Sequence, residues 1–151
     1  MKFDGECHVD APQEAVWAAL FDPETLKRCV PGCESVTPLG EAGYDVTAVL
    51  KVGPVKARFA GRMELRDIDA PHACTIVAEG SGGAAGTAKG EARVTLVPQD
   101  GGTLVQYTSN ATPAGKIAQL GSRLLDSTAK MMSRKFFAKL KDEVELSDEA
   151  A

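Results

Sequence analysis

Hydrophobic and polar residues alternate through most of the first two thirds of the chain, the pattern of strands with one buried and one solvent-facing side. The clearest case is residues 55–66, where one series is apolar and the other is mostly Lys, Arg and Glu. Further strands are predicted at residues 2–9, 36–39, 44–52, 74–78, 88–96 and 105–109. Gly- and Pro-containing turns separate several of them, at residues 53–54, 80–86 and 100–102. We therefore expect a curved antiparallel sheet of about six to seven strands.

Two short helices are expected between the first and second strands. The first begins after Asp10, a candidate N-cap, and Asp22-Pro23 ends it. One side of this helix is apolar: Val16, Trp17 and Leu20. The second short helix occupies Pro23–Cys29.

The period of the pattern changes after Pro113, where apolar residues recur every three and four positions. One helix over residues 114–145 would be about 45 Å long at ~1.5 Å per residue, long enough to cross the whole sheet. Residues one apart cannot share a helix face, so one member of Met131-Met132 and one of Phe136-Phe137 must point toward a rim, a pocket mouth or a partner. We expect one domain over residues 1–146 and a disordered acidic tail over residues 147–151. The fold class is α+β.

Composition agrees with one globular domain of 151 residues, of which 44% are hydrophobic and 25% charged. The net charge of −4, with acidic and basic residues interleaved, argues against a nucleic-acid partner. Apolar runs are far shorter than the ~20 residues of a membrane span, and the N-terminus has no apolar signal core. We expect a cytoplasmic protein, monomeric or homodimeric.

The predicted inner face of the sheet is rich in small residues: Ala48, Ala57, Gly61, Ala78, Gly90 and Ala92. A curved sheet of this kind, crossed by an apolar helix, predicts a cavity for a lipophilic small molecule. The alternative is that small residues only allow strand curvature and close helix approach. Candidate polar groups are Tyr107, Ser109 and the Trp17 indole. The predicted lining is Trp17, Val46, Ala48, Leu50, Phe59, Met63, Ile76, Ala78, Ala92, Tyr107, Ile117, Leu120, Leu124, Met132 and Phe136.

Catalytic and metal-binding patterns are weak. His8 is expected on the outward side of an edge strand and His72 in a turn, and neither is placed beside a nucleophile. The glycine-rich residues 80–86 lack phosphate-loop spacing. Cys29 and Cys33 lack the further ligands that a zinc site needs, so the four cysteines are expected to be small buried residues, with an exposed Cys33 thiol as the alternative. We predict no catalytic residue, no metal and no cofactor.

The order of elements and five sequence blocks resemble a known family. The blocks are Val16-Trp17-Ala18-Ala19-Leu20, residues 29–35 (CVPGCES), 51–57 (KVGPVKA), 82–90 (GGAAGTAKG) and 115–124 (GKIAQLGSRL). They are similar to the START-like polyketide-cyclase and lipid-transport superfamily, which has the helix-grip fold. Within it, they resemble the family of the G subunit of carbon monoxide dehydrogenase.

The resemblance implies a non-catalytic accessory protein of a molybdenum hydroxylase of the carbon monoxide dehydrogenase type, linked to maturation or membrane recruitment of that enzyme. Its partners would be the hydroxylase subunits, and peripheral association with the inner face of the cell membrane is an open alternative. A quinone or a lipid would suit the cavity. Two other functions stay open: a cyclase- or hydrolase-type enzyme using the same cavity, and a pure interaction module with a filled core.

Overall fold

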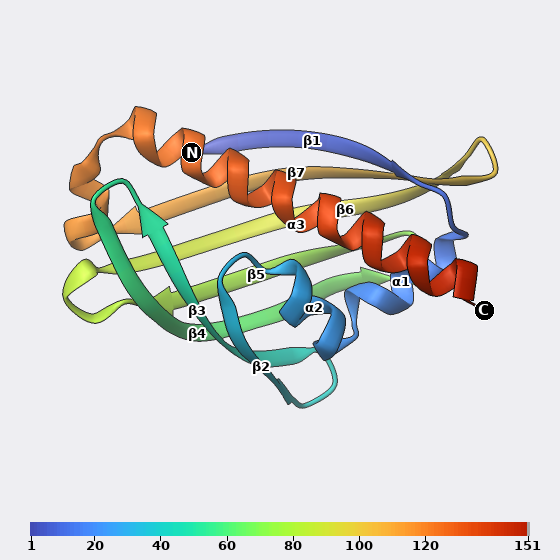
Figure 1. Cartoon of the computed structure of the whole chain (residues 1–151), viewed down its shortest axis with the longest axis horizontal. Coiled ribbons are helices and arrows are strands. Elements are labelled where there is room, and N and C mark those ends of the chain that lie inside the picture. Colours follow the sequence, from blue (N-terminus) through green and yellow to red (C-terminus); the bar gives the residue numbers. More distant parts are fainter. Residues whose placement is uncertain (151) are drawn as a thin grey trace.

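The computed structural model describes residues 1–150, with side chains described through Ser147. The elements follow one another in the order predicted, from a first strand through two short helices and a strand meander to a long helix (Figure 1). Their bounds are β1 (Lys2–Val9), α1 (Gln13–Leu20), α2 (Pro23–Cys29), β2 (Cys33–Leu39), β3 (Gly43–Val52), β4 (Val55–Asp69), β5 (Ala73–Ser81), η1 (Gly83–Ala85), β6 (Thr87–Gln99), β7 (Gly102–Ala114), η2 (Gly115–Leu120) and α3 (Ser122–Ala150).

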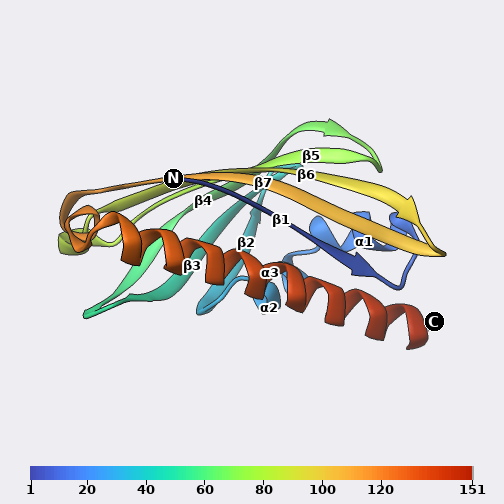
Figure 2. The same ribbon diagram turned by 90° about the horizontal axis from the view of Figure 1, so that it is seen from above.

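The seven strands form one open antiparallel sheet in the order β1-β7-β6-β5-β4-β3-β2. The first strand pairs with the last, so β1 and β2 are the two edges. The sheet curves, and α3 runs along its concave side (Figures 1 and 2). The predicted fold class, with its sheet, its long C-terminal helix and its two short helices, is confirmed.

Alternation in β4 shows why the sheet has one apolar side. Phe59, Met63 and Leu65 are buried, whereas Lys56 and Arg58 are exposed. Because successive strand residues point to opposite faces, this register places every second residue of β4 on the concave side.

The two short helices begin differently. Asp22 caps α2: its carboxylate accepts hydrogen bonds from the Thr25 backbone N–H at 3.2 Å and from the Thr25 hydroxyl at 2.6 Å. The predicted cap of α1 by Asp10 is wrong, because Pro12 occupies the N-cap position and provides no side-chain cap.

The C-terminal segment departs from the single helix expected over residues 114–145. Strand β7 continues to Ala114, the 3₁₀ turn η2 follows, and α3 begins only at Ser122. Gly115 and Gly121 have φ angles of +81° and +97°, which an L-residue rarely adopts, so these two glycines separate strand, turn and helix. At its other end α3 reaches Ala150, and the tail expected from residue 147 thus overlaps the helix; Ala151 lies outside the described residues.

The buried apolar residues form two clusters. The larger joins α1, α2, the strands and the second half of α3 (residues 137–147), where Phe137, Leu140 and Val144 are buried. The smaller lies around the first half of α3 (residues 122–136) and consists of Val52, Phe59, Ala85, Ile117 and Leu125. None of the described helices is both long enough and apolar enough to span a membrane.

Candidate functional site

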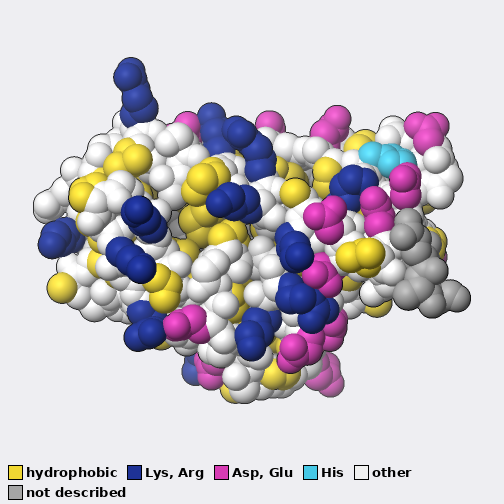
Figure 3. Space-filling view, in the orientation of Figure 1, with side chains coloured by type: hydrophobic (Ala, Val, Ile, Leu, Met, Phe, Trp, Pro, Cys, Tyr) yellow, Lys and Arg dark blue, Asp and Glu magenta, His cyan; other side chains and the backbone are white. Residues whose placement is uncertain are grey.

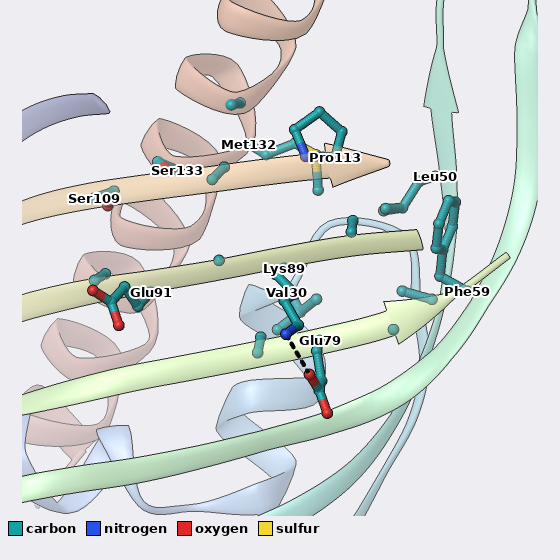
Figure 4. A pocket seen from close by; sticks show the side chains of 18 of the residues that line it. Val30, Leu50, Phe59, Glu79, Lys89, Glu91, Ser109, Pro113, Met132 and Ser133 are labelled. Atoms are coloured by element: carbon teal, nitrogen blue, oxygen red, sulfur yellow. Dashed lines mark ion pairs between the residues drawn. The ribbon is translucent and has the colours of Figure 1, made fainter. Parts of the chain in front are cut away.

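A cavity of about 390 Å³ lies between the concave face of the sheet and the first half of α3. In Figure 4, Met132 and Ser133 border it from α3, while Leu50 and Phe59 border it from β3 and β4. Residues of both apolar clusters contribute to its wall, among them Met63 and Phe137 of the larger and Ile117 of the smaller. The cavity therefore occupies the space between the two clusters.

Small side chains on both walls leave this space open. The sheet contributes Ala48, Ala78 and Ala92, and α3 contributes Ala129 and Ser133. None of these side chains is long enough to bridge the distance between the sheet and the helix. The prediction that the small-residue face borders a cavity agrees with this placement.

Close approach of neighbouring strands explains some of these small residues. Gly61 pairs with Gly80 across β4 and β5, and a Cβ at Gly61 would overlap the backbone carbonyl of Glu79. Only glycine allows this close approach of two strands. The two explanations of the small residues thus apply together, the second most clearly at Gly61.

Most of the predicted lining residues lie on the cavity wall: Val46, Ala48, Leu50, Phe59, Met63, Ile76, Ala78, Ala92, Ile117, Met132 and Phe136. Four do not. Leu120 and Leu124 pack against the smaller cluster instead. Trp17 packs against Phe21 with ring centroids 5.0 Å apart, and Tyr107 stacks on Phe137 at 4.1 Å.

Sequence reasoning missed other lining residues, among them Met1, Phe3, Val30, Pro31, Val52, Leu125, Thr128, Ala129, Ser133 and Phe137. The alternation of β1 already places Phe3 on the inward side, so this residue could have been found. No periodic signal places Val30 and Pro31, because they follow α2 in a loop that the fold brings to the cavity.

Few uncharged polar side chains reach the cavity. Ser109, predicted as a polar group, is 7% exposed and lies on the wall, as do Thr128, Ser133 and the exposed Asn110. Tyr107 is held elsewhere by its stacking on Phe137, and burial raises the pKa of its phenol. A ligand would therefore meet an apolar surface with a small number of hydroxyl groups.

Four charged residues also border the space: Arg62, Glu79, Lys89 and Glu91. They lie on the outward-facing side of β4, β5 and β6. They reach the edge of the cavity because the neighbouring glycines have no side chains there. Lys89 Nζ lies 3.7 Å from Glu79 Oε2, the ion pair drawn in Figure 4. These charges belong to the exposed face and partly neutralise one another.

Both histidines are engaged away from the cavity. His8 Nε2 lies 2.9 Å from the Gln99 carbonyl oxygen, and His72 Nδ1 lies 3.0 Å from Gln13 Nε2. Neither residue lines the cavity. They are thus not positioned to act on a bound molecule.

The four cysteines are free thiols; Cys29 and Cys74 are buried as expected, whereas Cys7 and Cys33 are only half-buried. Burial raises the pKa of each, to about 12 for Cys29 and to about 11 for Cys74. A thiol with a raised pKa is protonated at neutral pH and is a poor nucleophile and metal ligand. Within the described residues, no group of three or more His, Cys, Asp and Glu side chains could hold a metal ion.

Sequence and structure both resemble those of known proteins. A family model described as the G subunit of carbon monoxide dehydrogenase (CoxG) matches residues 5–145. A crystal structure of a conserved protein from Geobacillus kaustophilus is similar, with 31% sequence identity, a TM-score of 0.89 and 97% of each chain covered. A search of curated proteins found no match.

More distant structures share the fold. The Zhui aromatase/cyclase from Streptomyces sp. R1128 has 17% identity and a TM-score of 0.70, with 96% of this chain and 94% of that chain covered. The protein Ara h 8.0201 has 18% identity and a TM-score of 0.67, with 95% and 97% covered. At this level of identity the likeness concerns the architecture alone.

Proposed function

The chain belongs to the CoxG family, that of the G subunit of carbon monoxide dehydrogenase, and on that premise we propose that it is a non-catalytic accessory protein which binds a lipophilic small molecule. The enzyme it serves is a molybdenum hydroxylase of the carbon monoxide dehydrogenase type. Its role is to aid maturation or membrane recruitment of that enzyme. The cavity between the sheet and α3 is the observation that carries the ligand-binding part.

Size and polarity of the cavity support a lipophilic ligand. Its volume of about 390 Å³ falls in the range of ~300–1,000 Å³ that small-molecule sites occupy. The wall is mainly apolar, and Ser109, Thr128 and Ser133 offer hydroxyl groups that could orient one polar end of a ligand. A quinone or a lipid has this combination of an apolar body and a few acceptors.

Two alternatives have less support. A cyclase or hydrolase needs an acid, a base or a nucleophile against its substrate. Both histidines lie off the wall, and burial raises the pKa of the four thiols. The carboxylates that border the cavity, Glu79 and Glu91, are exposed and belong to the outward side of the sheet. A pure interaction module with a filled core does not need the open space beside Ala129 and Ser133.

Ligand extraction and thermal shift test the proposal. Purified protein is analysed by native mass spectrometry and by organic extraction, and menadione is added as a quinone probe. Saturating ligand should raise Tm by roughly 5 °C or more. Recovery of no apolar molecule, together with no shift on adding the probe, would exclude a lipophilic carrier.

A matched pair of variants on α3 assigns any binding to the cavity. Ala129→Phe places a ring inside the cavity and should abolish the thermal shift. Ala138→Phe makes the same change at an exposed position of the same helix and should leave the shift intact. Equal losses in both would indicate that the ligand binds elsewhere.

The partner is tested separately by pull-down with purified molybdenum-hydroxylase subunits. Capture of these subunits, unchanged by Ala129→Phe, would support an accessory role independent of the cargo. Failure to bind them, with ligand binding intact, would leave a carrier that serves another enzyme.

A further inference from the structure

One stripe of α3 runs beside the edge strand β1, along a line that we call the seam (Figures 1 and 2). At three- and four-residue spacing the stripe presents Lys130, Arg134, Phe137 and Lys141. Two of its three cations have an acidic partner one helical turn away. Lys130 Nζ lies 3.0 Å from Asp126 Oδ2, and Lys141 Nζ donates hydrogen bonds to both carboxylate oxygens of Glu145. Arg134 differs, because it takes part in no ion pair among the described residues.

Tyr107 reaches the same seam from β7. Its ring stacks on Phe137 at 4.1 Å, and it is paired with Gly5 of β1. A Cβ at position 5 would collide with the Tyr107 hydroxyl, so only glycine lets the phenol extend over β1 toward the free edge of the sheet. Burial raises the pKa of Tyr107, and the nearby charge of Arg134 acts in the opposite direction. The phenol therefore keeps its proton at neutral pH and lies within the electrostatic reach of Arg134.

The Tyr107 hydroxyl has no hydrogen-bond partner among the described residues. The other tyrosine of the chain, Tyr44, donates to the Phe21 carbonyl oxygen at 2.8 Å. Tyr107 is only 7% exposed. In the part of the chain that the structure describes, every fully buried side-chain oxygen and nitrogen has a partner. The small exposed part of Tyr107 therefore includes its hydroxyl, which a ligand can reach.

A depression at the β1 edge adjoins this hydroxyl. Its lining is Lys2, Phe3, Asp4, Thr108, Lys130 and Arg134. Phe3 also lines the cavity, so it borders both spaces. Figure 3 shows hydrophobic side chains in a hollow of this face with Lys and Arg at its margin. The lining has three cations and one carboxylate, an environment that favours a negatively charged group.

Two donors without partners define the kind of group that fits. A guanidinium offers two parallel N–H groups that match the two oxygens of a carboxylate, and a neutral phenol adds a third donor. Asp4 borders the depression as well, and its negative charge disfavours a second charge on the ligand. A carboxylate with a single charge therefore suits the site better than a phosphate with two.

We propose that Tyr107 and Arg134 form a binding site for the carboxylate group of an organic acid, at the seam between β1 and α3. The carboxylate has two possible sources. One is a short free acid, which needs only the seam. The other is the head group of a longer acid whose chain passes Phe3 into the cavity, and this second source rests on the proposed function.

Calorimetry with three probes tests the site. The full chain is titrated at neutral pH with octanoate, with 1-octanol as the uncharged molecule of equal chain length, and with acetate. Octanoate should bind more tightly than octanol. If octanoate also binds more tightly than acetate and Ala129→Phe removes this advantage, the acid is a long-chain one. If acetate binds as well as octanoate, it is a short free acid.

Two variants remove the donors one at a time. Tyr107→Phe deletes the hydroxyl but keeps the ring on Phe137, and it should weaken octanoate binding about tenfold. Arg134→Gln should weaken it about fivefold, since its charge is exposed. Neither change should affect octanol binding. Because the Tyr107 hydroxyl has no protein partner, Tyr107→Phe should fold as stably as the parent.

Matched controls make the same chemical changes elsewhere. Lys135→Gln removes an exposed cation at the next position of α3, and Tyr44→Phe removes the other phenol hydroxyl. Both should bind octanoate like the parent. Asp4→Asn should instead strengthen octanoate binding by a few fold, because it removes a like charge from the depression.

Ring-labelled tyrosine gives a direct readout, since the chain has only two tyrosines. In NMR spectra, octanoate should shift the signal that Tyr107→Phe removes and leave the signal of Tyr44 in place. Unequal shifts of this kind would support the site. Shifts confined to Tyr44 would overturn it.

The affinities separate this inference from the proposed function. Equal affinities for octanoate and octanol, or equal losses in Arg134→Gln and Lys135→Gln, would overturn the carboxylate site. If menadione still binds in that case, the proposed function stands and only the site is wrong. If acetate binds through Tyr107 and Arg134 while no lipophilic probe binds, the site is right and the lipophilic carrier is wrong.

Discussion

The two halves of α3 face the same sheet but differ in what they contact. The second half inserts Phe137, Leu140 and Val144 into the main cluster, where they are 5%, 0% and 3% exposed. The first half presents Thr128, Ala129 and Ser133 to an open cavity. One continuous helix thus completes the core at one end and covers a cavity at the other.

This contrast indicates that side-chain volume, rather than helix position, decides where the interior is filled. Large residues at three- and four-residue spacing reach the sheet in the second half. In the first half, large side chains also line the cavity, among them Met132 and Phe136. The short side chains of Thr128, Ala129 and Ser133 lie among them and, with the alanines of the sheet, leave space between the two walls. Stability and ligand capacity should therefore be separable by substitution along one helix.

Leu140→Ala should have the largest effect on folding. Its side chain is fully buried, and a Leu→Ala change at such a site costs about 2–5 kcal/mol in the free energy of unfolding. Leu124→Ala, at a half-buried position of the first half, should cost clearly less. Urea unfolding of both variants measures the contrast, and equal costs would mean that the two halves are packed alike.

Enlarging an alanine should have opposite effects on the free energy of unfolding at the cavity and in the main cluster. Ala129→Leu extends into empty space and should leave the free energy of unfolding unchanged or raise it by about 1 kcal/mol. Ala11→Leu, at a position 2% exposed in the main cluster, should lower it by about 1–3 kcal/mol through overpacking. Destabilisation of similar size by both would show that the cavity closes in solution.

Alkaline pH should weaken the main cluster. The pKa values of Cys29 and Cys74 are raised from 9.0 to about 12 and about 11. Between these values the unfolded chain releases thiol protons that the folded chain keeps, so stability is fully present below pH 9 and falls as pH rises toward 11.

The share of Cys29 and Cys74 in this loss is isolated by comparison with Cys29→Ala/Cys74→Ala, because Cys7 and Cys33, whose pKa values are also raised, remain in the variant. Burial also raises the pKa of Tyr44 and Tyr107, which adds a loss of the same sign at higher pH. The difference in the free energy of unfolding between parent and variant should change by roughly 2–3 kcal/mol from about pH 8 to about pH 10. A difference that does not change with pH would show that the thiols titrate alike in both states.

The smallest expected effects are those of substituting the adjacent methionines Met131 and Met132. Met131 is 43% exposed, and Met131→Ala should change the free energy of unfolding by less than about 0.5 kcal/mol and leave ligand binding unchanged. Met132 lies on the cavity wall, so Met132→Ala should weaken menadione binding by a few fold. Thermal shift on both variants checks the pair; an equal response would remove the distinction between wall and surface.

Much of the architecture follows from the sequence alone. The alternation in residues 55–66 identifies β4 and its inward face, and the bounds of α2 follow from Pro23 and the turn after Cys29. The change of period after Pro113 indicates the long helix. It also requires one member of Met131-Met132 to leave the core centre, and Met131 is the exposed one. These features depend on neighbours a few residues apart, which is why a local pattern contains them.

Only the tertiary structure decides which inward residues meet the cavity. Tyr107 is on the correct face of β7, yet Phe137 stacks on it; Trp17 is on an apolar helix face, yet it packs against Phe21. Val30 reaches the wall from a loop without any period. A period assigns a side chain to a face, but the position where α3 crosses the sheet determines whether that side chain finds a partner or open space.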